Sequence, residues 1–152
     1  MAWASRQLSG DRRTLVSSRS GRSVRTPGSS YILGSDRGPS AIIEASQQVE
    51  LYDETLRYEP YREWGGVATA ATLNLDGRVD GPAVQAIQDF VQPHVGRGKF
   101  LVTLTGEHTG ALGAIRAHAR NYPGMCVVQI DAHGDLRQAY QDNPYSHASV
   151  MA

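Results

Sequence analysis

The sequence contains a single cysteine among 152 residues. One thiol can form neither an intramolecular disulfide nor a cysteine-based zinc site within one chain. Cys126 stands in the apolar run from Met125 to Val128, and free cysteines usually pack as small hydrophobic side chains. We therefore expect Cys126 to lie in the core, as part of a buried strand.

Long apolar runs and an excess of charge of one sign are also absent. No stretch reaches the roughly 20 consecutive apolar residues that a transmembrane helix needs. The 15 basic and 15 acidic side chains cancel, which removes the general electrostatic case for binding nucleic acid or an anionic membrane surface. We expect one globular domain with neither a membrane nor a nucleic acid as its partner.

Apolar and acidic residues are scarce in residues 1–30. This segment is rich in serine and arginine, with Asp11 as its single acid. The arginines are Arg6, Arg12, Arg13, Arg19, Arg22 and Arg25. Such a composition buries too little surface to offset the ordering entropy, so we expect residues 1–30 to be disordered and residues 31–152 to form the domain. It is also typical of a mitochondrial transit peptide, whereas cytoplasmic residence is the default expectation.

Apolar periodicity and turn residues divide the remaining chain into alternating strands and helices. Strands are expected at residues 31–33, 67–75, 100–104 and 126–130, the third covered on both faces. Helices are expected at residues 39–49, from Asp80 onward with Pro93 ending the helix early, and at 111–120. This alternation predicts a parallel sheet, whose ligands gather beyond the carboxyl ends of its strands, here residues 105–109 and 131–135.

Three residues of metal-ligand type alternate just after the last predicted strand. Asp131, His133 and Asp135 stand at i, i+2 and i+4, and alternate side chains of extended backbone share one face. The other strand end supplies Glu107 and His108, and we expect His108 to reach the same point. Two carboxylates and two imidazoles suit manganese best, with zinc, cobalt, iron and nickel as alternatives. Taken alone, this pattern also has a structural interpretation, because Asp and His commonly end strands as turn and capping residues.

The other histidines carry no such spacing. His94 follows Pro93, and His118 lies within a predicted helix. We interpret both as structural or solvated residues. His147 has no local spacing argument of its own.

The candidate ligands and His147 lie in longer segments that occur in a fixed order along the chain. These segments are Thr105-Gly106-Glu107-His108-Thr109, residues 129–137 and residues 143–151. They resemble successive motifs of the ureohydrolase (arginase/agmatinase) family, with the greatest likeness to agmatinases. Residues 37–53 resemble the first helix of the same family. The likeness therefore extends over residues 31–152.

The resemblance implies a fold and a reaction. The fold is a three-layer α/β/α sandwich with a mostly parallel sheet. The reaction uses two bridged manganese ions to hydrolyse a small guanidino substrate, and agmatine would give urea and putrescine in polyamine biosynthesis. Relatives also act on arginine, guanidinobutyrate, guanidinopropionate or formiminoglutamate. Full-length members are expected to form homo-oligomers.

The resemblance also assigns roles by motif. His108 would bind the first metal, Asp131 would bridge both metals, and His133 would bind the second. Asp135 would bind the first metal and orient the catalytic hydroxide. His147 would correspond to the family's catalytic proton-relay histidine.

Two departures from the family pattern limit this expectation. Only Ser35 and Asp36 separate Gly34 from Arg37, where the family has a longer loop. The sequence ends at Ala152, before the strand that carries the family's Asp-x-Asp motif, so the second metal site is expected to be incomplete. We expect the N-terminal half of the sandwich. The alternative function is that of a catalytically inactive fragment that interacts with full-length ureohydrolase subunits.

Overall fold

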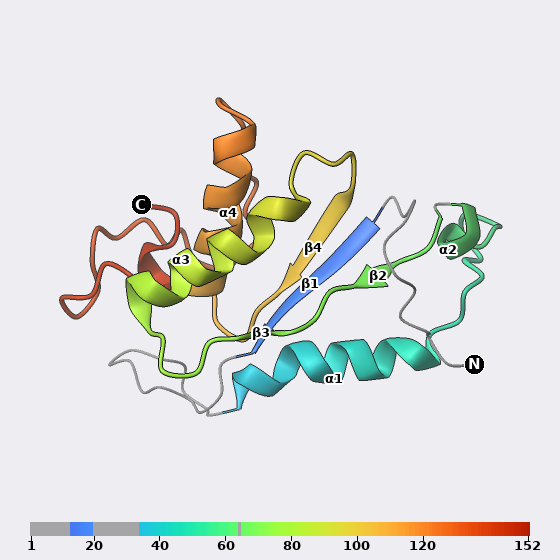
Figure 1. Ribbon diagram of the computed structural model, residues 1–152, viewed down its shortest axis with the longest axis horizontal. Coiled ribbons are helices and arrows are strands. Elements are labelled where there is room, and N and C mark those ends of the chain that lie inside the picture. Colours follow the sequence, from blue (N-terminus) through green and yellow to red (C-terminus); the bar gives the residue numbers. More distant parts are fainter. Residues whose placement is uncertain (1–12, 20–33, 64) are drawn as a thin grey trace.

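The computed structural model describes residues 13–19, 34–63 and 65–152. Its strands are β1 (Arg13–Arg19), β2 (Ala68–Thr69), β3 (Leu73–Asn74) and β4 (Phe100–Leu104). Its α-helices are α1 (Gly38–Ala45), α2 (Pro60–Glu63), α3 (Asp80–Val91) and α4 (Thr109–Asn121). Short 3₁₀ helices are η1 (Ser35–Arg37), η2 (Ser46–Gln48), η3 (Gln92–His94) and η4 (His147–Ser149). Figure 1 shows their arrangement.

The sheet is parallel, as predicted, and β1 is its centre. β4 pairs with β1 from Arg13↔Phe100 to Ser17↔Leu104. β2 and β3 pair with β1 at Thr14–Leu15 and Ser18–Arg19, also in parallel. Helix α3 connects β3 to β4, which makes the crossover unit that parallel strands require.

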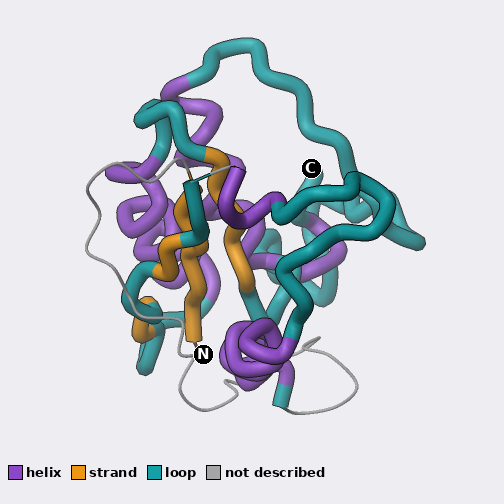
Figure 2. Tube along the Cα trace, turned by 90° about the vertical axis from the view of Figure 1, so that its right-hand side faces the viewer, coloured by secondary structure: helices purple, strands orange, loops and turns teal. Residues whose placement is uncertain are grey.

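Helices lie on both sides of the strands (Figures 1 and 2). α3 and α4 pack together on one side, and α1 lies on the other. The core joins α3 and α4 to the sheet, and its buried members are Leu75, Ile87, Val91, Val95 and Ala117. Gly113 lets the two helices approach, because a Cβ there would lie 2.7 Å from the Val84 carbonyl oxygen. This layering agrees with the predicted α/β/α arrangement.

Most predicted elements around this core are confirmed. The predicted helix at 39–49 forms as α1 and η2, with Pro39 in its first turn. The helix from Asp80 ends at Val91, and Pro93 lies in the 3₁₀ turn after it. The strand at 100–104 and the helix over 111–120 are both present. These segments have strong local periodicity, which explains why the sequence pattern finds them.

The N-terminal prediction is wrong in part. Composition predicts disorder over residues 1–30, but Arg13–Arg19 form β1. Backbone pairing with three strands supplies hydrogen bonds that do not depend on side-chain composition. The rest of that segment, and the strand predicted at 31–33, lie outside the described residues. The strand predicted at 67–75 is interrupted between Thr69 and Leu73 and becomes β2 and β3.

The predicted strand at 126–130 is absent, and this is the largest correction. The segment is a loop, Cys126 is exposed rather than in the core, and Val128 and Ile130 are 86% and 97% exposed. A parallel strand needs a neighbour to pair with its backbone, and no strand of the described chain pairs with this segment. β4 is likewise not covered on both faces, since Phe100 is 67% exposed.

No helix in the described ranges is both long and apolar enough to span a membrane.

Candidate metal centre

The end of β4 places the first predicted ligand. After Leu104 the chain turns through residues 105–108, and α4 begins at Thr109. The Thr105 hydroxyl donates to the backbone oxygen of Glu107 at 2.8 Å, and the Gly110 amide donates to the same oxygen at 3.0 Å. These bonds fold the loop tightly, so that His108 is held at the start of α4.

A second contact fixes this loop from outside. The Ser35 hydroxyl in η1 donates to the Glu107 carboxylate at 3.1 Å. The backbone of Gly106 lies so close to η1 that a Cβ at this position would be 2.6 Å from the Ser35 carbonyl oxygen. Glycine at this position therefore allows η1 and the end of β4 to touch.

The other ligands come from residues 131–135. The His133 amide donates to Asp131 Oδ1 at 3.0 Å, which closes a small turn. Asp135 has a φ of +49°, a left-handed conformation that aspartate tolerates better than most residues. The Met151 amide donates to the Asp135 carbonyl oxygen at 3.0 Å, so the C-terminal turn holds this loop in place.

The loop after β4 and the loop at residues 131–135 converge on a group of three residues. His108 Nδ1 lies 3.1 Å from Asp135 Oδ2. One ligand atom from each of His108, Asp131 and Asp135 lies within 4.8 Å of the others. The side chain of Asp135 is 8% exposed. One imidazole and two carboxylates are hard nitrogen and oxygen donors, and this set fits one divalent ion such as manganese or zinc.

The surroundings of the Asp131 carboxylate favour its ionised form, which metal binding requires. The amide of His133 lowers the pKa of Asp131 below its ordinary value, and it is the largest cause of the shift. Burial acts in the opposite direction, and the nearby imidazoles of His108 and His133 lower the pKa further. The carboxylate is therefore ionised, which is the form that binds metal.

Two predicted site residues lie outside this group. The His133 side chain is 81% exposed, with Nδ1 3.6 Å from Asp131 Oδ1. The prediction that Asp131, His133 and Asp135 share one face of extended backbone is wrong, because the segment turns at 131–133 and Asp135 is left-handed. His147 lies in η4, and its ring meets that of Tyr140 edge-on at 5.9 Å.

The histidines that we interpreted as structural have structural contacts. His118 Nδ1 donates to the Ala114 carbonyl oxygen at 2.8 Å within α4. His94 packs edge-on against Phe90. Burial lowers the pKa of His94, and Arg97 and Lys99 lower it further.

Two residues near the ligands have no role that the sequence assigns. Gln129 contacts Asp135 and His133, and Ser35 contacts Glu107 from 72 residues away. The sequence could have singled out Gln129, because it is a polar residue inside an apolar run. No feature of the sequence singles out Ser35, because its partner is distant in the sequence.

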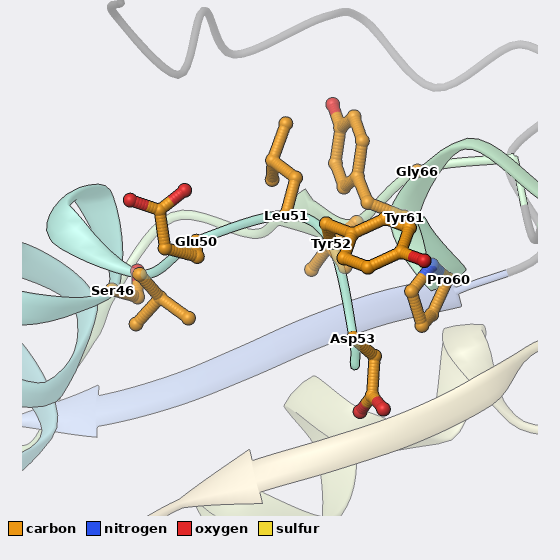
Figure 3. A pocket seen from close by; sticks show the side chains of 10 residues that line it. Ser46, Glu50, Leu51, Tyr52, Asp53, Pro60, Tyr61 and Gly66 are labelled. Carbon is orange, nitrogen blue, oxygen red and sulfur yellow. The ribbon is translucent and has the colours of Figure 1, made fainter. Parts of the chain in front are cut away.

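A separate pocket of about 330 Å³ lies beside η2 and α2 (Figure 3). It lies beyond the amino end of β2, because Val67 lines it, whereas His108 comes after the carboxyl end of β4. Tyr52, Tyr61 and Glu50 line it, and it includes none of the predicted site residues. It is therefore a different feature from the ligand group.

Comparison with known proteins identifies the class to which this fold and site belong. The model of the arginase family matches residues 23–152. The chain therefore belongs to the arginase family.

Within this family, individual similar proteins are named as agmatinases or related ureohydrolases. The N(1)-aminopropylagmatine ureohydrolase of Synechocystis is 41% identical over 127 residues, which cover 80% of this chain and 41% of that protein. The agmatinase of Bacillus anthracis is 32% identical over 129 residues, again 80% of this chain and 41% of the relative. The crystal structure of the agmatine ureohydrolase of Thermoplasma volcanium matches with a TM-score of 0.75 and 26% identity, over 92% of this chain and 44% of that one.

The chain thus spans about two fifths of the length of the curated relatives that it matches. The two curated relatives named above are ureohydrolases of the agmatinase and aminopropylagmatine type, and the fold of this chain is the corresponding part of the arginase-like α/β fold.

The contact between Gly106 and η1 gives a direct test of how the site is held. Gly106→Ala places a methyl group against the Ser35 carbonyl oxygen, so we expect a loss of about 1–3 kcal/mol in the free energy of unfolding. Urea unfolding followed by circular dichroism measures it. Gly38→Ala is the matched control, because a Cβ there meets nothing within 4 Å and alanine favours the helix. Equal stability of the two variants would contradict the proposed close contact.

Proposed function

We propose that this chain carries one part of the metal centre of an agmatinase-type ureohydrolase. The reaction is hydrolysis of a C–N bond in a guanidino substrate, and agmatine would give urea and putrescine. The observation that carries the proposal is the convergence of His108, Asp131 and Asp135 beyond the end of β4. The named activities of the agmatinase and aminopropylagmatine relatives support the choice of substrate class.

Each residue has a defined place in this proposal. His108 and Asp135 would hold the first manganese ion, and Asp131 would lie between the two metal positions. His133 would serve the second position from its exposed place beside Asp131. A bound manganese ion would supply a water molecule acidified enough to act near neutral pH.

The chain's own groups would then handle the proton and the substrate. The carboxylate of Asp135 would accept a hydrogen bond from the attacking water and orient it. His147, beside Tyr140, would carry a proton to the leaving amine as a general acid. In the full-length enzyme we place this reaction in polyamine biosynthesis, in a cytoplasmic homo-oligomer.

Metal binding by the chain is the first prediction of this proposal. We expect isothermal titration calorimetry to show at most one Mn²⁺ per chain, because His133 and the shared Asp131 are the only proposed ligands of the second position among the described residues. His108→Ala or Asp135→Ala should abolish the binding, since each removes a ligand of a three-residue group. His147→Ala is the control and should bind as the wild type does. Two tightly bound, spin-coupled ions in EPR spectra would contradict it.

The same binding should depend on pH in one direction. The pKa of Asp131 is lowered from an ordinary value that already lies below 5, so its carboxylate is ionised between about pH 8 and about pH 5. Binding should nevertheless weaken as the pH falls through about 6.5, because imidazole ligands must be neutral and histidine generally protonates there. Calorimetric titrations at a series of pH values measure this, and affinity that stays constant down to about pH 5 would exclude an imidazole ligand.

Urea release tests the reaction itself. A chimera would join residues 1–152 to the part of the Synechocystis relative that lies after its matched region. With Mn²⁺, we expect urea from agmatine or aminopropylagmatine and much less from arginine or guanidinobutyrate. The chimera carrying Asp135→Ala is the inactive control. A folded, metal-binding chimera that releases urea from none of the four substrates would overturn the assignment.

A second candidate function rests on the exposed run at 125–130. Val128 and Ile130 face solvent, and large exposed apolar patches mark interaction sites. This supports the interaction part of the alternative function, in which an inactive chain binds arginase-family subunits through this segment.

Co-expression tests the pairing. With the full-length Synechocystis relative, we expect a joint peak in size-exclusion chromatography that Val128→Glu removes. Ile42→Glu alters another exposed apolar residue, on α1, and should leave the peak unchanged. A chain that elutes alone, or the same loss with both variants, would exclude the pairing through this segment.

A further inference from the structure

Gln129 reverses the usual arrangement of polar and apolar side chains. It is the one polar residue between Met125 and Ile130. Its apolar neighbours Val128 and Ile130 are exposed, whereas the contact of its amide with Asp135 is partly buried. Burial of a polar group is unfavourable unless it is hydrogen-bonded. The contacts of its amide must therefore account for its inward position.

The amide nitrogen of Gln129 contacts two points of residues 131–135, here called the ligand loop. Nε2 donates to Asp135 Oδ2 at 3.0 Å and to the His133 carbonyl oxygen at 3.2 Å. Both partners are acceptors, so the nitrogen and not the oxygen of the amide must face them. The two bonds use both protons of one NH₂ group, and they join the two ends of the turn from His133 to Asp135.

The oxygen that Gln129 contacts is the one that faces His108. Asp135 Oδ2 lies 3.1 Å from His108 Nδ1. Asp135 also has a left-handed backbone, a conformation that costs energy in a non-glycine residue. A carboxylate with little solvent exposure and a strained backbone needs a fixed donor to keep one orientation.

We propose that Gln129 is a positioning residue for the metal centre, holding Asp135 toward His108 and Asp131 before an ion binds. The inference rests on the proposed metal centre, since positioning matters only if these residues bind metal. Partners of this kind orient the ligands directly, and their loss costs about 10–100-fold in metal affinity. Gln129 itself does not bind the ion.

Mn²⁺ titration of the full chain tests this directly. Gln129→Met keeps the length of the side chain and removes its N–H donor, so we expect Mn²⁺ affinity to fall by about 10–100-fold. The visible spectrum of bound Co²⁺ should also change, because the ligand geometry around the ion is less constrained. Gln138→Met is the matched control, as Gln138 is exposed three residues after Asp135, and it should retain both the affinity and the spectrum.

The outcomes separate the inference from the proposed function. A wild-type chain that binds no Mn²⁺ would refute the proposed metal centre. A wild type that binds and a Gln129→Met variant that binds equally well with the same Co²⁺ spectrum would overturn the role of Gln129. If Gln129→Met does not fold, NMR of the side-chain amide decides: Asp135→Ala should shift the Gln129 NH₂ resonances and speed their exchange. Unchanged resonances would also overturn the role.

Discussion

A carboxylate withdrawn from water must be met by hydrogen-bond donors or cations, and Asp135 imposes this constraint on the site. Its Oδ2 lies within 3.1 Å of His108 Nδ1 and 3.0 Å of Gln129 Nε2. Its carbonyl oxygen accepts from the Met151 amide. The start of α4, the ligand loop and the C-terminal turn therefore meet at one residue. A change that turns the Asp135 side chain away would release it from His108 and Gln129, whereas the backbone contact with Met151 does not depend on the side chain.

Two opposing contributions to the folding free energy act on the run from Met125 to Ile130: burial of its apolar side chains and the hydrogen bond of Gln129 to Asp135. Leaving Val128 and Ile130 in solvent forfeits about 1.5–3 kcal/mol for each side chain. Removing a hydrogen bond from a partly buried carboxylate costs about 1.5–3 kcal/mol. The magnitudes are comparable, and the described chain offers no neighbouring strand against which the apolar side chains would pack. The segment is therefore oriented by the contact of Gln129 with Asp135, and its apolar side chains remain outside.

The sequence predicts elements whose signal is local and misses those that depend on distant partners. Val84, Ile87 and Val91 recur at helical spacing, and α3 forms where they predict it. The strand expected at Cys126 depends on pairing that no local pattern can reveal, and it is absent from the described chain. In the candidate site, the motifs predict that His108 lies near Asp131 and Asp135, and one ligand-type atom of each lies within 4.8 Å of the others. The outward direction of His133 results from a turn that spacing alone does not predict.

The position of the site depends on β1, the strand that the composition of residues 1–30 does not predict. Parallel strands run in the same direction, so the pairing of β1 with β4 brings the carboxyl ends of both strands to the same edge of the sheet. The described chain resumes at Gly34, and η1 meets the loop after β4 through Ser35, Glu107 and the bare backbone of Gly106. Side chains 72 residues apart thus support His108. The location of the proposed metal-binding residues therefore depends on the sheet, and the motif supplies the chemistry of their side chains.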